Sequence, residues 1–218
     1  MPRLIYNKYD KRMLSALPVE TFEGNVVVIT NETDARKAVR FLLSCDMLGV
    51  DTETRPSFRP GQIYKVSLLQ VATRKECFLF RLNKMGITPS VKRLLENVDV
   101  PMIGLSWHDD LLSLHRRGEF TAGNFVDLQH LVRNIGIEDL ALQKIYANLF
   151  HKKINKRQQL SNWDAPELNE RQRQYAALDA WACLRIYGEL ERLERTGDFQ
   201  LVKVVEPEPQ ETSKSINR

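Results

Sequence analysis

The chain has 218 residues, which is enough for one large domain or at most two small ones. Hydrophobic residues make up 43% of the chain and charged residues 28%, so a sizeable core is expected. The net charge of +4 permits a polyanionic partner without requiring one. No apolar run approaches the ~18 residues of a membrane-spanning helix, and no secretory leader pattern opens the chain. The three scattered cysteines argue against a disulfide framework and a zinc site, so we expect a cytoplasmic protein.

The hydrophobic residues of the segment 1–24 show no strong periodicity, and this segment is expected to form an N-terminal arm. β-Branched and apolar segments predict strands over residues 25–30, 47–52, 65–73, 76–82, 102–106 and 124–127. Helical spacing predicts helices over about 34–45, 90–97, 108–117, 128–134, 140–150 and 169–196, the first of them capped by Thr33 or Asp34. The polar Arg74-Lys75 between two strands indicates an antiparallel hairpin.

This order of elements predicts an α/β fold, in which a mixed sheet of five to six strands is flanked by helices. The folded domain is expected to cover residues 25–197. The end of the chain is polar and contains Pro207 and Pro209, so residues 198–218 are expected to form a disordered tail.

Two acidic residues stand two positions apart in the segment Val50-Asp51-Thr52-Glu53. Alternate side chains of a strand leave the same face, so Asp51 and Glu53 should project together, about 7 Å apart. Their position at the end of an apolar strand is where ligand crevices form in open α/β sheets. An Asp-x-Glu pair alone is equally typical of an ordinary exit from a strand into a loop.

A third acid, Asp179, lies within the apolar stripe of the long C-terminal helix, one turn after Tyr175. A carboxylate that faces a core requires a compensating partner, which is either a basic side chain or a cation. A fourth acidic position is Asp109 or Asp110, at the start of the helix that follows residues 102–106. The helix dipole alone also favours an Asp in a first turn.

Taken in order, these motifs resemble the DEDD 3′-5′ exonucleases of the tyrosine subclass, the family of ribonuclease D and the Werner-helicase exonuclease domain. The likeness extends over about Val26 to Leu193 and includes Leu68-Leu69-Gln70, Leu160-Ser-Asn-Trp163 and Tyr175-Ala-Ala-Leu-Asp179. It implies a ribonuclease-H-like fold and a metal-dependent enzyme that releases nucleoside 5′-monophosphates from single-stranded DNA or RNA 3′ ends.

The resemblance also implies roles for five side chains: Asp51, Glu53, Asp110, Tyr175 and Asp179. The four carboxylates would hold two divalent ions, Mg²⁺ or Mn²⁺, which are hard cations that prefer oxygen ligands. Asp51 would bridge the ions, while Tyr175 would act on the attacking water as its orienter or as a general base. Orientation is preferred, because a Tyr with an ordinary pKa of about 10 is a poor base at neutral pH. An apolar residue follows the acid in family members, so Asp110, which precedes Leu111, is preferred over Asp109.

Further residues are expected to contact nucleic acid. A basic segment contains Lys152, Lys153, Lys156 and Arg157. Such a segment can meet backbone phosphates, and it is equally typical of a solvated loop. Thr54 matches the family position beside the terminal nucleotide, and Phe58 in the loop after Glu53 could meet a terminal base.

Two other functions remain open at this point. One is a nucleic-acid-binding module that keeps the fold without the chemistry, and the presence of all four acids speaks against it. The other is an enzyme that acts on small phosphate compounds at a similar acidic site. The chain has no Gly-rich phosphate loop and no Gly-x-Ser-x-Gly motif, which argues against an NTPase and a common serine hydrolase.

Overall fold

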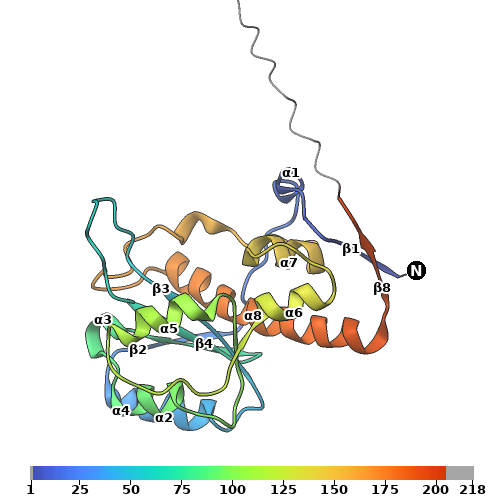
Figure 1. The fold of residues 1–218 in the computed structure, drawn as a ribbon. Coiled ribbons are helices and arrows are strands. Elements are labelled where there is room, and N and C mark those ends of the chain that lie inside the picture. The colour runs from blue at the N-terminus through green and yellow to red at the C-terminus, as the bar shows by residue number, and fades with distance from the viewer. Residues whose placement is uncertain (1, 205–218) are drawn as a thin grey trace, which may run out of the picture.

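The computed structural model describes residues 2–204, whose main body is a six-stranded mixed sheet covered by helices on both faces (Figure 1). The strands lie in the spatial order β2 (Asn25–Ile29), β5 (Glu76–Phe80), β4 (Leu68–Ala72), β3 (Leu48–Glu53), β6 (Met102–Gly104) and β7 (Phe125–Asp127). β4 pairs antiparallel with β3 and β5, and the other pairs are parallel. The predicted sheet and its hairpin are therefore confirmed.

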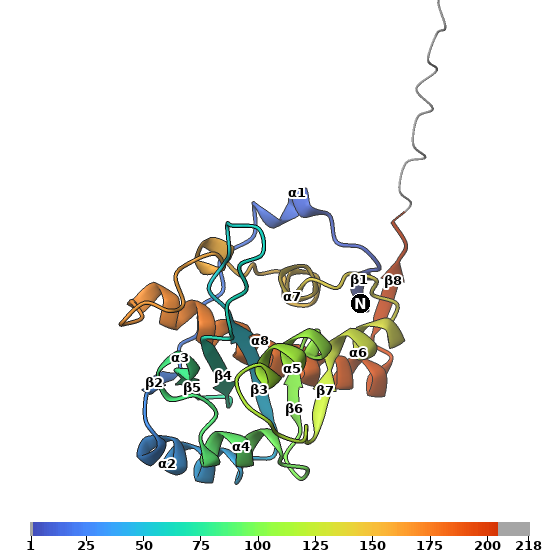
Figure 2. The same ribbon diagram turned by 60° about the vertical axis from the view of Figure 1, so that its left-hand side comes forward.

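The helices form two layers, one on each face of the sheet (Figure 2). One core packs α2 (Glu32–Leu42), α4 (Pro89–Leu95) and α5 (Trp107–His115) against the first face. The other core packs α6 (Leu128–Asn134), α7 (Leu142–Phe150) and α8 (Glu170–Thr196) against the second face. Three shorter helical segments complete the helices of the described residues: α1 (Lys11–Leu14), α3 (Leu82–Met85) and the 3-10 helix η1 (Lys156–Gln158). No helix within residues 2–204 is both long and apolar enough to cross a membrane.

Several predicted boundaries shift in the structure. The first long helix is capped by Asn31, whose side chain accepts from the Asp34 amide, rather than by Thr33 or Asp34. The strand expected from residue 65 begins at Leu68. Residues 198–204 were predicted to begin a disordered tail, whereas Phe199–Val202 form β8, which pairs in parallel with β1 (Arg3–Tyr6). The remainder of the predicted tail, 205–218, lies outside the described residues.

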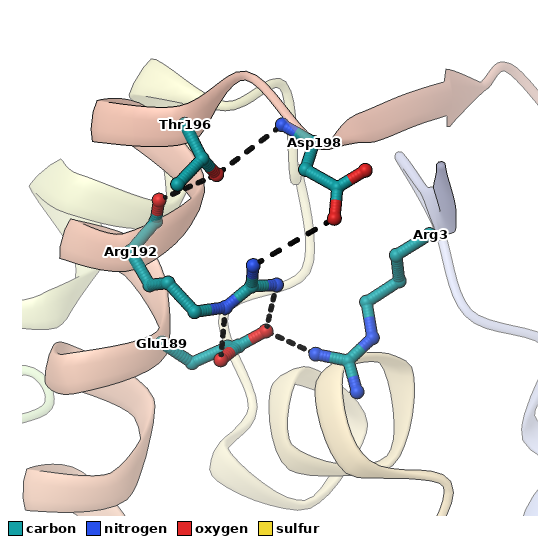
Figure 3. A network of polar contacts seen from close by, with 5 residues as sticks. All are labelled: Arg3, Glu189, Arg192, Thr196 and Asp198. Carbon is teal, nitrogen blue, oxygen red and sulfur yellow. Dashed lines mark hydrogen bonds and ion pairs between the residues drawn. The ribbon is translucent and has the colours of Figure 1, made fainter. Parts of the chain in front are cut away.

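An ion-pair network joins this small two-stranded sheet to the end of α8 (Figure 3). Glu189 accepts from both Arg3 and Arg192, and Arg192 also lies 3.9 Å from Asp198. The Thr196 hydroxyl donates to the Arg192 carbonyl and accepts from the Asp198 amide, so it closes the turn into β8. The two strands are thus fastened to the helix that carries Asp179.

The N-terminal arm continues from β1 across α7 and reaches the segment before η1. Glu20 is buried, and it accepts from the Tyr146 hydroxyl at 2.7 Å and from Lys152 Nζ at 2.9 Å. Val19 forms a parallel bridge with Lys153, and Lys153 Nζ donates to the Ser15 carbonyl. The arm therefore holds the basic segment in place from outside the sheet.

A glycine on β3 allows α8 to approach the sheet closely. Gly49 faces α8, and a Cβ built at this position would lie 2.1 Å from the Ala180 carbonyl oxygen. A backbone atom cannot turn aside as a flexible side chain can, so any larger residue must push the helix and the strand apart. Ala180 and its neighbours Ala176 and Ala177 are themselves small and completely buried. Small residues on both β3 and α8 thus allow the close approach.

We expect Gly49→Ala to lower the free energy of unfolding by about 1–3 kcal/mol, because the added methyl group overpacks the β3–α8 contact. Gly188→Ala is the matched control: it lies in α8 with no atom within 4 Å of the added Cβ, and it should stabilise the chain by roughly 0.5–1 kcal/mol. Urea unfolding of both variants measures the difference. If Gly49→Ala and Gly188→Ala had equal free energies of unfolding, the contact at Gly49 would not limit how closely β3 and α8 pack.

Candidate metal centre

The first two acidic side chains lie at the C-terminal end of β3, a central strand of the sheet. Asp51 and Glu53 alternate with Thr52 and therefore share the face that carries Gly49 and meets α8. Glu53 is 8% exposed, whereas Asp51 is partly exposed. The predicted projection of both carboxylates from one face is what the structure shows.

The third acid comes from α8, whose first turn is set by a capping box between Asn169 and Gln172. From this start, Tyr175 and Asp179 are placed one turn apart on the buried side of the helix. The Tyr175 hydroxyl donates a hydrogen bond to the Asp179 carboxylate. Asp179 is 5% exposed, and its Oδ1 atom is buried without a partner within residues 2–204.

These elements bring three carboxylates together. One oxygen each of Asp51, Glu53 and Asp179 lies within 4.8 Å of the others. Three acids at this spacing repel one another in the absence of positive charge, and oxygen ligands are those that Mg²⁺ and Mn²⁺ prefer. The Asp179 Oδ1 atom has no hydrogen-bond partner in the described part of the chain and is therefore free to act as a metal ligand. The three carboxylates together thus fit a hard divalent cation.

The electrostatic strain in the cluster appears as raised pKa values. Burial, and then the charge of Asp51 and other nearby carboxylates, raises the pKa of Glu53 to about 10. Burial raises the pKa of Asp179 to about 7, although the hydrogen bond from Tyr175 and the charge of Lys156 act to lower it. A bound cation would favour the ionised carboxylates and so reverse these shifts.

Tyr175 is unsuited to accept a proton. Burial, followed by the charges of Asp179 and Glu53, raises the pKa of the Tyr175 hydroxyl well above its ordinary value. The hydroxyl therefore stays protonated at neutral pH and acts as a hydrogen-bond donor. This favours the orienting role over that of a general base.

The fourth predicted acid lies at the edge of the cluster. Asp110 in α5 accepts a hydrogen bond of 2.5 Å from the Thr52 hydroxyl, whereas Asp109 is exposed to solvent. Burial raises the pKa of Asp110 to about 6, with a further increase from Asp109. Its charge also helps to raise the pKa values of Asp51 and Glu53, so it acts on the cluster without belonging to the group of three. Of the two neighbours, Asp110 is thus the one that faces β3.

One residue that supports this arrangement was missed by the sequence analysis. Asp127, at the end of β7, accepts from the backbone amides of Ser106 and Trp107 at 3.0 Å each. Ser106 has a positive φ of 61°, so the carboxylate holds a strained turn that starts α5. Asp127 also caps α6 through the Gln129 amide, and this capping was its only sequence signal.

The acids open into a cavity of about 260 Å³. Its opposite wall is formed by the start of α7 and the segment around η1, with Gln143, Ile154, Lys156 and Gln159 among the lining residues. Lys156 is thus the one predicted nucleic-acid-binding residue that shares the cavity with the carboxylates.

The other predicted contact residues lie around this cavity. Phe58 is 81% exposed and lines a second groove of about 430 Å³ between the loop after β3 and Leu160. Thr54 directly follows β3, and Arg157 is exposed beside a third cavity that also reaches Tyr175. Lys152 and Lys153 are bonded to the N-terminal arm, as described above. Trp163 is completely buried, so its ring packs inside the domain and is not available to stack on a base.

The raised pKa values predict a pH-dependent stability of the chain after EDTA treatment. The carboxyl groups have pKa values near 4 in the unfolded chain and higher values in the folded chain, so their protonated forms stabilise the fold. This stabilisation is complete below about pH 4. It is lost as the pH rises through about 7 for Asp179 and about 10 for Glu53. The melting temperature should therefore fall between pH 6 and pH 9, and Mn²⁺ should reduce this fall. Thermal unfolding with EDTA and with Mn²⁺ measures both effects, and identical pH profiles would contradict cation binding at the cluster.

Comparison with known proteins agrees with this geometry. A sequence model described as 3′-5′ exonuclease matches residues 26–193. The bifunctional 3′-5′ exonuclease/ATP-dependent helicase WRN of Mus musculus is 30% identical over 212 residues, which cover 92% of this chain and 15% of the mouse protein. The chain therefore corresponds to a small part of that relative.

Solved structures show the same fold. The Nibbler EXO domain of Aedes aegypti superposes with a TM-score of 0.74 at 21% identity, over 84% of this chain and 95% of that domain. Escherichia coli RNase D, described as an exoribonuclease involved in structured RNA processing, superposes with a TM-score of 0.70 at 19% identity, over 79% of this chain and 46% of that one. The expected ribonuclease-H-like fold is confirmed. With the matching family model covering most of its length, the chain belongs to the 3′-5′ exonuclease family.

Proposed function

We propose that this chain is a metal-dependent 3′-5′ exonuclease that removes nucleoside 5′-monophosphates from single-stranded nucleic acid ends. The observation that carries the proposal is the convergence of Asp51, Glu53 and Asp179 within 4.8 Å at the edge of the sheet. Membership of the family supplies the polarity of cleavage. The mildly basic charge of +4 is compatible with a polyanionic substrate.

Two divalent ions would be held by the carboxylates: Asp51, Glu53 and Asp179 would hold the ion that activates water, and Asp51 and Asp110 would hold the second ion. When bound, such a pair activates a water molecule and stabilises negative charge on the leaving 3′ oxygen. Tyr175 keeps its proton and can direct the hydroxyl toward the water. Ile154 and the apolar start of α7 line the same cavity, so part of its wall is apolar.

Lys156 would contact the phosphate that is cleaved. It lines the cavity of the acids, and its charge lowers the pKa of Asp179, so its ammonium group acts on the interior of the site. A fixed positive charge at this position can stabilise the negative charge that develops on the phosphate. The wider set of proposed contact residues consists of Thr54, Phe58, Lys152, Lys153, Lys156 and Arg157.

The acids are tested with end-labelled single-stranded DNA and RNA in Mg²⁺ and in Mn²⁺. Asp179→Asn and Asp110→Asn should each abolish detectable cleavage, because neither amide can bind a cation as the carboxylate does. Asp109→Asn is the matched control and should keep most of the activity, since Asp109 is exposed.

Other outcomes of the same panel identify the alternatives. Loss of cleavage in Asp109→Asn but not in Asp110→Asn would reverse the assignment of the second motif. Oligonucleotide binding without cleavage by the wild type would indicate a silent binding module. Hydrolysis of a small phosphate compound with no action on oligomers would indicate the other enzyme class.

Lys156→Met should lower kcat by up to ~10²-fold while leaving the fold intact, because the ammonium group stabilises charge that forms during the reaction. The control is Lys37→Met, since Lys37 is exposed on α2, which packs on the far face of the sheet. Steady-state kinetics separate kcat from KM. A variant with a raised KM and an unchanged kcat would place Lys156 in substrate binding alone.

A further inference from the structure

A buried amide beside the metal centre has no hydrogen-bond partner. The Gln70 side chain is completely buried, and neither Nε2 nor Oε1 bonds to any group within residues 2–204. Most buried polar side-chain atoms in folded proteins have a partner, and an unpaired amide costs a few kcal/mol. The unpaired Gln70 amide therefore does not stabilise the state that the structure describes.

The register of the sheet places this amide next to the acids. Gln70 in β4 lies directly opposite Asp51 in β3, so both side chains leave the same face, with Cβ atoms roughly 4.5–5.5 Å apart. Its other neighbours on this face are apolar: Leu68 and Ala72 on its own strand and Leu79 across on β5. Asp51 is thus the polar group directly beside the Gln70 amide on this part of the sheet.

A second unpartnered atom lies on the same side. α8 covers this face, and Asp179 Oδ1 is buried there without a hydrogen bond. Two unsatisfied polar groups on one face, one in the cluster and one beside it, indicate a site whose hydrogen bonding is incomplete. Rotation about the last torsion of a glutamine side chain meets only shallow barriers, so the amide can turn toward a carboxylate.

We propose that Gln70 is a positioning residue for the metal-binding carboxylates, and that its Nε2 group donates to Asp51 when the cluster holds cations. The donated hydrogen bond fixes the orientation of the Asp51 carboxylate relative to Glu53 and Asp179. Groups that orient metal ligands in this way typically affect metal affinity or activity by 10–100-fold. This inference rests on the proposed function, because it assumes that the cluster binds cations.

The test replaces the amide by an apolar side chain of similar length, Gln70→Met. Two quantities are measured: the melting temperature in EDTA and its increase on addition of Mn²⁺. Removal of an unpaired amide should leave the melting temperature in EDTA unchanged or raise it by ~2–4 °C. The increase produced by Mn²⁺ should become smaller, and kcat should fall by about 10–100-fold with little change in KM.

The matched control is a buried amide that is already satisfied. Asn148 is also completely buried, but it donates to the Tyr6 carbonyl at 2.6 Å and accepts from the Tyr6 amide at 3.0 Å, and it does not line the cavity of the acids. Asn148→Leu should lower the melting temperature in EDTA and leave the increase on Mn²⁺ addition unchanged. The two variants are thus expected to respond in opposite ways.

Other results overturn the proposal. A Gln70→Met protein that is less stable in EDTA and responds to Mn²⁺ as the wild type does would make Gln70 a structural residue. A variant that does not fold, or one unchanged in every measurement, also contradicts it. Gln70→Asn keeps the amide but shortens its reach, so normal kcat in this variant would contradict the proposed hydrogen bond. A wild-type chain that neither responds to Mn²⁺ nor cleaves oligonucleotides would instead refute the proposed function.

Discussion

The distance between β3 and α8 controls whether the chain has a site at all. Asp51 and Glu53 belong to the sheet and Asp179 belongs to the helix, so the carboxylates can share a cation only if the two backbones lie close together. The absence of a side chain at Gly49 allows this approach, and the small residues of α8 maintain it along the helix. Packing density on this face is thus a condition of the chemistry rather than only a source of stability.

The same closeness has an electrostatic cost. Burial raises the pKa of Glu53 to about 10, and of Asp179 to about 7, so the cluster resists full ionisation without cations. The Gln70 amide, which has no hydrogen-bond partner among the described residues, lies beside the cluster and adds a further unfavourable term. The rest of the fold must offset these terms through two extensive apolar cores and through the contacts of the N-terminal arm. Local features that disfavour folding are common where a protein binds a ligand, because binding makes them favourable.

Much of this arrangement could be predicted from the sequence. The period of two in a strand places Asp51 and Glu53 on one face, and an acid in the apolar stripe of a helix marks Asp179 as unusual. Both depend only on neighbours along the chain. The order of the motifs then implied the fold, which the structure and the solved relatives confirm.

What the sequence could not provide depends on contacts between distant segments. The turn that aims Asp110 is held by Asp127, whose only local signal was that of a helix cap. β1 and β8 are short, and each lacks an apolar face long enough to be recognised without its partner. The choice between Asp109 and Asp110 needed the rotation of α5 relative to β3, which the hydrogen bond to Thr52 now defines. The partners of Lys152 and Lys153 likewise lie more than a hundred residues away.

The pairing of β1 with β8 has a consequence for the order of assembly. Residues 3–6 meet residues 199–202, so this contact closes nearly the whole described chain into a single loop. Contacts of such long sequence separation carry a large entropic penalty, and they form after the local helices and the hairpin. During synthesis, β1 leaves the ribosome well before β8, so the pairing must wait for β8. The contact that fastens the start of the arm to the end of α8 therefore forms late, after the sheet and helices between the two strands have folded.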